Sequence, residues 1–425
     1  MSSYLPRIVD HELDELQAGL PALALEGPKA VGKTKTAERR ARTVIHLDDP
    51  NTRELLDGDP SRLISGPPPI LIDEWQRFPS SWDLVRRAVD RDSSPGRFLL
   101  TGSATPIPGV TTHSGAGRIV TVRMRPLSLA ERFPGIATVS LGALLSGAKP
   151  ALHGRAVLTL TDYVEEIVRS GFPAIRALGG RARRSQLDGY LERIVDRDFE
   201  ELGHHIRDEG ALRRWLSAYA AASSTTASYE VIRDAASSGE SDKPSRGTTG
   251  PYRATLERLW MIDDVPAWLP TRNHLRRLAS APVHQLADPA LAAALLGVDE
   301  DRLLDASETG PSVPRDGTLL GALFQSLVTQ SVRVYAQANE TRVGHLRTHG
   351  GEHEIDLIIE RRGGQAVALE IKLAQSVTDR DVRHLRWLAD QLGPDLLDAA
   401  VITTGTEAYR RRDGIAVIPA ALLTH

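Results

Sequence analysis

Residues 23–34 constrain the fold of this chain more than any other stretch. They read Leu-Ala-Leu-Glu-Gly-Pro-Lys-Ala-Val-Gly-Lys-Thr, an apolar run followed by Gly-x-x-x-x-Gly-Lys-Thr, and residues 35–41 after them are helix-like. Strand, glycine-rich loop and helix in this order are typical of a phosphate-binding loop. Gly27 and Gly32 let the backbone bend around an anion where a Cβ would clash. The stretch predicts an α/β fold with a phosphate group at the end of a buried strand.

The loop also predicts a role for its individual residues. Loop amides and the N-terminus of the following helix point at the β-phosphate. Lys33 is expected to reach the β- and γ-phosphates as a catalytic group, and the Thr34 hydroxyl to ligate Mg²⁺. A chance glycine-rich turn is the alternative, and the strand and helix on either side disfavour it. The residues expected to hold ATP are Gly27, Pro28, Lys29, Ala30, Val31, Gly32, Lys33, Thr34 and Lys35.

A second buried strand carries two carboxylates. Residues 69–76 read Pro-Ile-Leu-Ile-Asp-Glu-Trp-Gln, and three large aliphatic residues in a row suit a parallel strand buried on both faces. Asp73 and Glu74 follow at its carboxyl end, where ligands bind in open α/β sheets. We expect Asp73 to hold Mg²⁺ through water and Glu74 to polarise the attacking water. An ordinary acidic strand end is the alternative, which the preceding phosphate loop disfavours.

Two further segments supply candidate groups for the same site. Residues 97–103 predict a third buried strand, after which Thr101 or Ser103 could contact the γ-phosphate or the water; a plain turn explains each hydroxyl equally well. Arg118 follows Gly117 just before the predicted strand 119–122. It is either an arginine finger, acting in cis or in trans on the transition state, or a surface arginine.

These motifs resemble the predicted ATPases of the AAA superfamily. The resemblance rests on residues 27–34, 70–74 and 99–103, and on Gly117-Arg118 followed by Pro126-Leu127-Ser128. It implies a core AAA-type fold, ATP and Mg²⁺ binding, hydrolysis, and a C-terminal domain of unknown function. Its relation to archaeal-type and signal-transduction ATPases makes a self-associating switch, a homo-oligomer, a second expectation.

Composition bounds the cellular setting and the number of domains. A length of 425 residues suggests about three domains, and we place them at 1–150, 151–271 and 272–425. The net charge of −3 provides no overall attraction to nucleic acid, so any DNA contact must use a local basic surface. The chain has no cysteine, no apolar run of membrane-spanning length and no apolar signal core, and a cytoplasmic protein is expected.

The middle domain is predicted to be helical. Three helices, near 212–219, 229–233 and 250–259, precede a hairpin that ends at Trp268. Three helices followed by residues 261–268 resemble a winged helix. Arg246, Arg253 and Arg258 could then touch DNA phosphates. A winged helix with a structural role only is equally compatible, and Asp263 and Asp264 would repel DNA.

The C-terminal domain is predicted to bring two carboxylates and a lysine together across a hairpin. A strand carrying Asp356 and a strand carrying Glu370 and Lys372 are joined by the turn at residues 361–364. Asp356 and Glu370 could hold Mg²⁺ or Mn²⁺, and Lys372 could activate water. This arrangement resembles the PD-(D/E)XK nuclease core, an α/β restriction-endonuclease-like fold. Related tails often have glutamate where this chain has Gln325, which weakens a second metal site.

Two functions therefore compete at this level. One is an ATP-hydrolysing enzyme that acts on DNA and carries a metal-dependent nuclease. The other is an ATP-dependent switch that oligomerises or binds DNA and uses an inactive nuclease-like tail as a scaffold.

Overall fold

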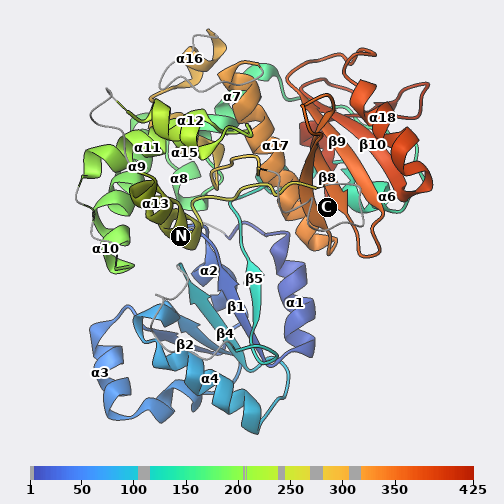
Figure 1. Cartoon of the computed structure of the whole chain (residues 1–425). Coiled ribbons are helices and arrows are strands. Elements are labelled where there is room, and N and C mark those ends of the chain that lie inside the picture. Colours follow the sequence, from blue (N-terminus) through green and yellow to red (C-terminus); the bar gives the residue numbers. More distant parts are fainter. Residues whose placement is uncertain are drawn as a thin grey trace.

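The computed structural model describes residues 4–103, 115–203, 206, 208–237, 245–268, 281–305 and 317–425. The expected boundary between residues 271 and 272 lies outside these residues. Three parts follow one another along the chain: an α/β part, a helical part and a second α/β part (Figure 1).

The first part is a five-stranded parallel sheet with the strand order β2-β3-β4-β1-β5. The strands β1, β3 and β4 are almost wholly buried, as the runs of large apolar residues predict. The expected strands are thus confirmed within a residue or two. The elements are α1 (Val9–Gly19), β1 (Ala22–Glu26), α2 (Lys33–Glu38), β2 (Thr43–His46), α3 (Pro50–Gly58), η1 (Pro60–Ile64), β3 (Ile70–Asp73), η2 (Trp75–Arg77), α4 (Ser80–Arg91), β4 (Phe98–Gly102) and β5 (Val120–Arg123).

The helical part packs a long helix and several shorter ones around buried aromatic side chains, among them Trp215 and Tyr219. Ile262 and Val265 form isolated antiparallel bridges with Leu286 and Val283, so their pairing partners lie beyond Trp268, where the predicted hairpin ends. Its elements are α7 (Leu160–Arg169), α8 (Pro173–Arg176), α9 (Gly180–Arg193), the π-helical turn η3 (Ile194–Asp198), α10 (Phe199–Glu201), α11 (Glu209–Ala221), α12 (Tyr229–Ala235), α13 (Arg246–Arg258), α15 (Pro289–Leu296) and α16 (Glu300–Leu304).

The last part is a mixed sheet with the strand order β11-β12-β10-β9-β8-β7. Strands β7, β8 and β9 are antiparallel neighbours, whereas β10 is parallel to both β9 and β12. The crossover from β9 to β10 contains α18. The elements are α17 (Leu319–Ala338), β7 (Arg342–Arg347), β8 (Glu354–Glu360), β9 (Ala366–Lys372), α18 (Arg383–Leu392), η5 (Gly393–Asp395), β10 (Leu396–Thr403), β11 (Tyr409–Arg410), β12 (Ala416–Pro419), η6 (Ala420–Leu422) and β13 (Leu423–Thr424).

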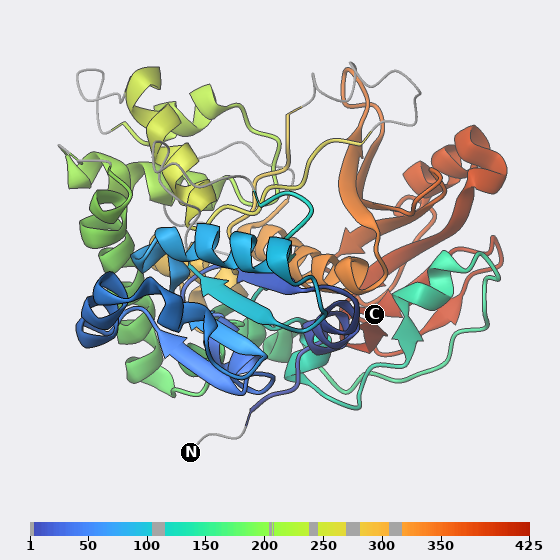
Figure 2. The same ribbon diagram turned by 90° about the horizontal axis from the view of Figure 1, so that it is seen from below.

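The helix α17 joins the three parts. It lies between the helical part and the last sheet (Figure 1) and contacts α1, α5 (Leu129–Arg132), α7, α15, β7 and β9. The segment after β5 also crosses to the last sheet: β6 (Val139–Ser140) pairs with β13, and α6 (Leu141–Leu145) packs on β9 and β10. Figures 1 and 2 both show α6 beside that sheet.

Among the helices of the described residues, none has both the length and the apolar character that crossing a membrane requires.

Candidate functional site

The loop between β1 and α2 has the backbone conformation that its glycines predict. Gly27 has φ 151°, and a Cβ there would lie 2.2 Å from the Met124 carbonyl oxygen. Gly32, with φ 104°, stands at the N-cap of α2. Both positions favour glycine, because other residues rarely adopt these angles and no side chain fits at Gly27. The loop therefore wraps the end of β1 and opens α2 toward the same place.

Lys33 is folded over this loop. Its Nζ donates to the carbonyl oxygens of Gly27 and Pro28, each at 2.8 Å. Burial lowers the pKa of Lys33 to about 8, although the nearby carboxylates of Glu74 and Asp73 act in the opposite direction. A phosphate bound beside Lys33 would raise its pKa again and favour the charged form of the side chain.

The other two loop lysines point elsewhere. Lys29 Nζ is 2.6 Å from Asp198 Oδ1 in the π-helical turn η3, and Lys35 pairs with Glu38 on the surface of α2. Lys29 belongs to the loop and Lys35 to α2, and both side chains pair with carboxylates outside the loop. The Lys29 pair instead ties the loop to the helical part, a contact that sequence reasoning missed because η3 is remote in sequence.

A cluster of oxygens meets Lys33 at the carboxyl edge of the sheet. Thr34 Oγ1 donates to Asp73 Oδ1 at 2.8 Å, and the Thr101 hydroxyl donates to the same oxygen. His46 Nδ1 lies 3.2 Å from Asp73 Oδ2. The strand β4 lies between β1 and β3, which places Thr101 between the loop and the two carboxylates. Thr101 thus contacts Asp73, a partner that its strand-end position alone did not specify.

Glu74 follows β3 in a left-handed conformation, with φ 55°. Such angles are uncommon outside glycine and often mark functional sites. Its Oε2 accepts from the side-chain amide of Gln76 and, at 3.3 Å, from the Ser103 hydroxyl. The predicted catalytic carboxylate is therefore held by two donors that come from two strand ends.

Arg118 lies at the opposite edge of the sheet. In the parallel pair β1–β5, the last residue of β5 stands beside Glu26 and the first beside Leu23. Arg118 precedes β5, so the length of the strand separates it from the phosphate loop of its own chain. Its Nε donates to Asp90 Oδ1 at 2.9 Å, and its side chain is 45% exposed. The expectation of a role in cis is wrong for this arrangement, whereas a role in trans stays a prediction.

A buried charge cluster links the edge strand β5 to α17. Asp263 contacts Arg123 at 3.0 Å, Arg125 at 2.8 Å and Arg333 of α17 at 2.8 Å. Burial alone would raise the pKa of Asp263, but these guanidinium groups outweigh it and hold that pKa far below its usual range. The expectation that Asp263 repels DNA is therefore wrong, because this side chain is buried among cations.

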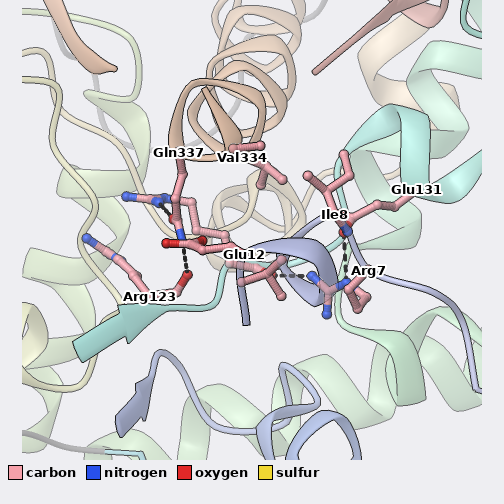
Figure 3. A pocket seen from close by; sticks show the side chains of 10 residues that line it. Arg7, Ile8, Glu12, Arg123, Glu131, Val334 and Gln337 are labelled. Carbon is pink, nitrogen blue, oxygen red and sulfur yellow. Dashed lines mark hydrogen bonds and ion pairs between the residues drawn. The ribbon is translucent and has the colours of Figure 1, made fainter. Parts of the chain in front are cut away.

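Gln337, one turn further along α17, completes the same junction. Its amide nitrogen donates to Glu12 Oε2 at 2.7 Å and to the Arg123 carbonyl oxygen at 2.9 Å. Figure 3 shows Gln337 pointing from α17 toward Glu12, with Arg7 beside Glu131 across the small hollow between them. The carboxyl end of β5 and the helix α1 thus contact α17 through polar groups.

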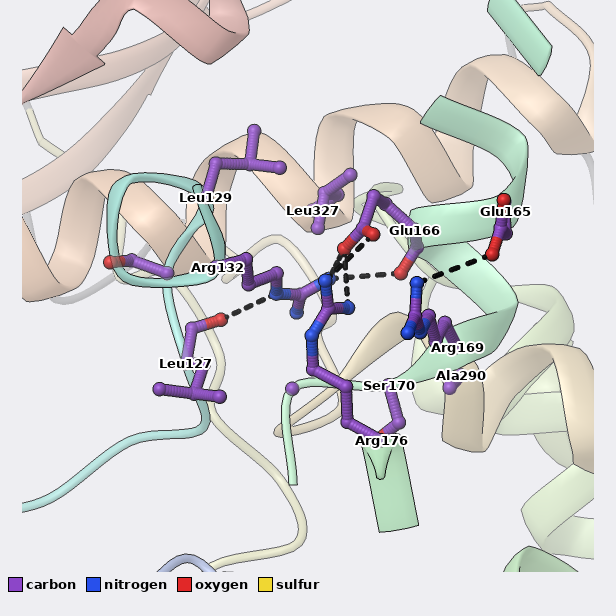
Figure 4. Close-up of polar contacts among 12 residues, drawn as sticks. Leu127, Leu129, Arg132, Glu165, Glu166, Arg169, Ser170, Arg176, Ala290 and Leu327 are labelled. Carbon is purple, nitrogen blue, oxygen red and sulfur yellow. Dashed lines mark hydrogen bonds and ion pairs between the residues drawn. The ribbon is translucent and has the colours of Figure 1, made fainter. Parts of the chain in front are cut away.

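Arg132 anchors the segment that leaves the first sheet. It is buried, donates to the Leu127 carbonyl oxygen at 2.8 Å and contacts Glu166 of α7 at 3.2 Å (Figure 4). Arg176 pairs with the same carboxylate at 2.6 Å. The Leu129 amide donates to Ser331 of α17 at 3.0 Å. This exit segment is therefore enclosed by both other parts of the chain.

The arginines predicted to touch DNA are occupied within the helical part. Arg246 pairs with Glu230 at 3.1 Å and Arg253 with Glu257 at 3.3 Å; Arg258 also has an interaction partner. Asp264 accepts from the Tyr219 and Tyr229 hydroxyls rather than facing solvent freely. DNA contact by these arginines stays a prediction.

The C-terminal candidate residues do converge. Asp356 Oδ1 accepts from Gln325 of α17 at 2.8 Å and its Oδ2 from the Ile371 amide at 2.7 Å, while Lys372 Nζ lies 2.8 Å from Glu370 Oε1. Burial raises the pKa of both carboxyl groups, and the charge of Asp356 raises that of Glu370 further. In the described part of the chain, no three histidine, aspartate or glutamate side chains are grouped to hold a metal ion.

Comparisons with known proteins bear on the first of these sites. Residues 20–133, which include the loop, Asp73 and Glu74, match the model of a family described as an AAA domain. This part of the chain is therefore similar to AAA-type P-loop ATPase domains. After it, residues 160–302 match a domain of unknown function, DUF8612, and residues 320–423 match another, DUF4143.

Sequence similarity to relatives extends over nearly the whole chain rather than over the AAA domain alone. The uncharacterized proteins Rv2008c of Mycobacterium tuberculosis and Mb2031c of Mycobacterium bovis are each 26% identical over 408 residues, covering 94% of this chain and 80% of the relative. A solved structure, the Walker-type ATPase paby2304 of Pyrococcus abyssi, is 17% identical with a TM-score of 0.35, over 67% of this chain and 94% of that one. That TM-score is too low to bear on the fold.

Proposed function

We propose that the chain is a Mg²⁺-dependent ATP hydrolase. The observation that carries this is the meeting of Lys33, Thr34, Asp73 and Glu74 around one loop. Thr34 Oγ1 donates to Asp73 Oδ1 at 2.8 Å beside the loop, so Thr34 would ligate Mg²⁺ and Asp73 would hold the ion through water, both with the oxygen atoms that this ion prefers. These two residues fit the ion, which supplies charge neutralisation on the phosphate oxygens when bound.

The side chains then divide the work. Lys33 leaves the Gly27 and Pro28 carbonyls and binds the β- and γ-phosphates. Glu74 takes the proton of the attacking water, since it is a carboxylate at the edge where the phosphates end. Thr101 orients Asp73 from the neighbouring strand.

The test is ATP hydrolysis by the purified chain in the presence of Mg²⁺, beside Lys33→Met. Loss of turnover in the variant supports the assignment, and undiminished turnover contradicts it.

ATP binding by the wild type should also depend on pH. Because the pKa of free Lys33 is about 8, ATP affinity should fall above that pH, by up to about tenfold per unit, and binding there should take up a proton. Calorimetry in two buffers of different ionisation enthalpy measures that uptake, which Lys33→Met should lack.

Arg118 supports a homo-oligomer as part of this proposal. It is exposed and separated from its own phosphate loop by the sheet, so it reaches a γ-phosphate only in a neighbouring subunit. We expect turnover per subunit to rise with protein concentration, and Arg118→Ala to abolish that rise with ATP affinity intact. The matched control is Arg91→Ala on α4. A concentration-independent rate, across a range where light scattering shows dissociation, would make Arg118 a surface residue paired with Asp90.

For the C-terminal domain, two functions stay in competition. Metal-dependent DNA cleavage is supported by the convergence of Asp356, Glu370 and Lys372. A scaffold in an ATP-dependent switch is supported by Gln325, whose amide donates to the Asp356 oxygen that a metal would need. We favour the scaffold, because Gln325 brings a donor where cleavage needs an acceptor.

The two functions predict different responses to Mn²⁺. Because burial raises the pKa values of Asp356 and Glu370, the stability of the metal-free fold falls as pH rises from the ordinary carboxyl pKa to these raised values, and most of the loss is present at pH 8. Glu370→Gln should therefore raise the melting temperature of the full chain at pH 8. If the pair binds Mn²⁺, the ion should also raise it, Asp356→Asn should remove that gain, and Gln325→Glu should increase plasmid nicking. If Mn²⁺ does not shift the melting temperature and Gln325→Glu does not nick plasmid DNA, the scaffold function is supported.

A further inference from the structure

Gln76 stands beside Glu74 in the single turn η2 that follows β3. Its Nε2 donates to Glu74 Oε2 and lies 3.3 Å from the Ser103 hydroxyl. A carboxylate only accepts hydrogen bonds, so the nitrogen of the Gln76 amide must face Glu74. This fixes the direction of the other half of the amide, the carbonyl oxygen Oε1.

That oxygen is buried and has no hydrogen-bond partner among the described residues. It lies against the end of β4, where a Cβ on Gly102 would come within 2.9 Å of it. Gly102 pairs with Glu26, the residue before the phosphate loop. Buried acceptors without a partner are rare and call for a reason. Here the unpaired acceptor sits at the strand end between Glu74 and the loop, where the attacking water has to be placed.

We propose that Gln76 is a positioning residue for ATP hydrolysis, which holds Glu74 through its Nε2 and accepts one hydrogen of the attacking water at its Oε1. This inference rests on the proposed ATPase function. Glu74 and Gln76 then supply two acceptors for the two hydrogens of that water, which turns a lone pair of its oxygen toward the γ-phosphorus.

The step balances without any further reactant. The water oxygen forms a bond to the γ-phosphorus. The bond from that phosphorus to the bridging oxygen breaks, and ADP leaves with the electron pair on that oxygen. One water proton passes to Glu74 and from there to solvent, and the other remains on the phosphate product. Gln76 exchanges no proton, so its contribution is the orientation of the water and of the carboxylate.

Gln76→Glu tests this with almost no change of shape. The second carboxylate removes the donor to Glu74 and places a like charge beside it. We expect kcat to fall at least about tenfold, whereas KM for ATP should stay within about twofold. Gln391→Glu, the same change on an exposed face of α18, is the matched control.

Gly102→Ala provides an independent variant, because its methyl group would displace the Gln76 amide and the Trp75 indole without touching their chemistry. Lower kcat with normal nucleotide binding in both variants supports the inference. An unchanged kcat in Gln76→Glu overturns it while ATP hydrolysis by the wild type stands. Absence of hydrolysis in the wild type would instead overturn the proposed function itself. If Gln76→Glu does not fold, unchanged kcat in Gly102→Ala overturns the inference alone.

Discussion

Glu74→Gln is expected to lower ATP turnover by about 10²-fold or more while ATP still binds, since that is the scale of lost general-base help. The amide has the shape of the carboxylate but cannot take a proton from water. The left-handed backbone at Glu74 is set by the turn from β3 into η2, so the exchange should leave the loop and its contacts in place.

Single-turnover hydrolysis, with ATP affinity measured separately, checks this result. The control is Glu54→Gln on α3, an exposed carboxylate on the same domain. A parallel fall of affinity and turnover would assign Glu74 a structural role, with the proton going elsewhere.

The second large effect concerns stability. Asp263→Asn should destabilise the chain by about 3–5 kcal/mol, the range for removing one partner of a buried ion pair. Arg123, Arg125 and Arg333 would then be buried together without a compensating charge. Because these groups hold the pKa of Asp263 far below its usual value, the stabilisation is present at neutral pH and lost only under strongly acidic conditions.

Urea unfolding of the two proteins at pH 7 measures this difference. Asp379→Asn is the matched control, since Asp379 also contacts two arginines but on the surface, where screening makes the pairs weak. Equal losses from both variants would mean that the buried cluster has no special weight.

Local pattern predicted the elements of the nucleotide site because each one depends on residues close in sequence. The glycines at 27 and 32 define the loop by themselves, and the apolar run before Asp73 defines a buried strand wherever it lies. The same holds for the hairpin that brings Asp356 opposite Glu370, since strand alternation and one turn determine it.

Contacts between distant segments could not be predicted in this way. No residue near Asp263 in the sequence indicates that it contacts Arg123 or Arg333. The acidic pair Asp263 and Asp264 therefore resembles a solvent-exposed pair in the sequence alone. The position of Lys29 in the loop predicts a contact with phosphate, but its side chain pairs with Asp198. Arg118 is a different case: the direction of parallel strands already implied that a residue before β5 lies away from the loop.

The pairing of β6 with β13 has a consequence for how the chain is made. Residues 139–140 pair with residues 423–424, and the Leu129 amide donates to Ser331. During synthesis, which proceeds from the N-terminus, the ATPase domain emerges from the ribosome long before either partner exists. Its exit segment, with the apolar Leu127, Leu129 and Leu141, must therefore remain partly uncovered until translation is nearly complete, so chaperone binding to the nascent chain would concentrate there.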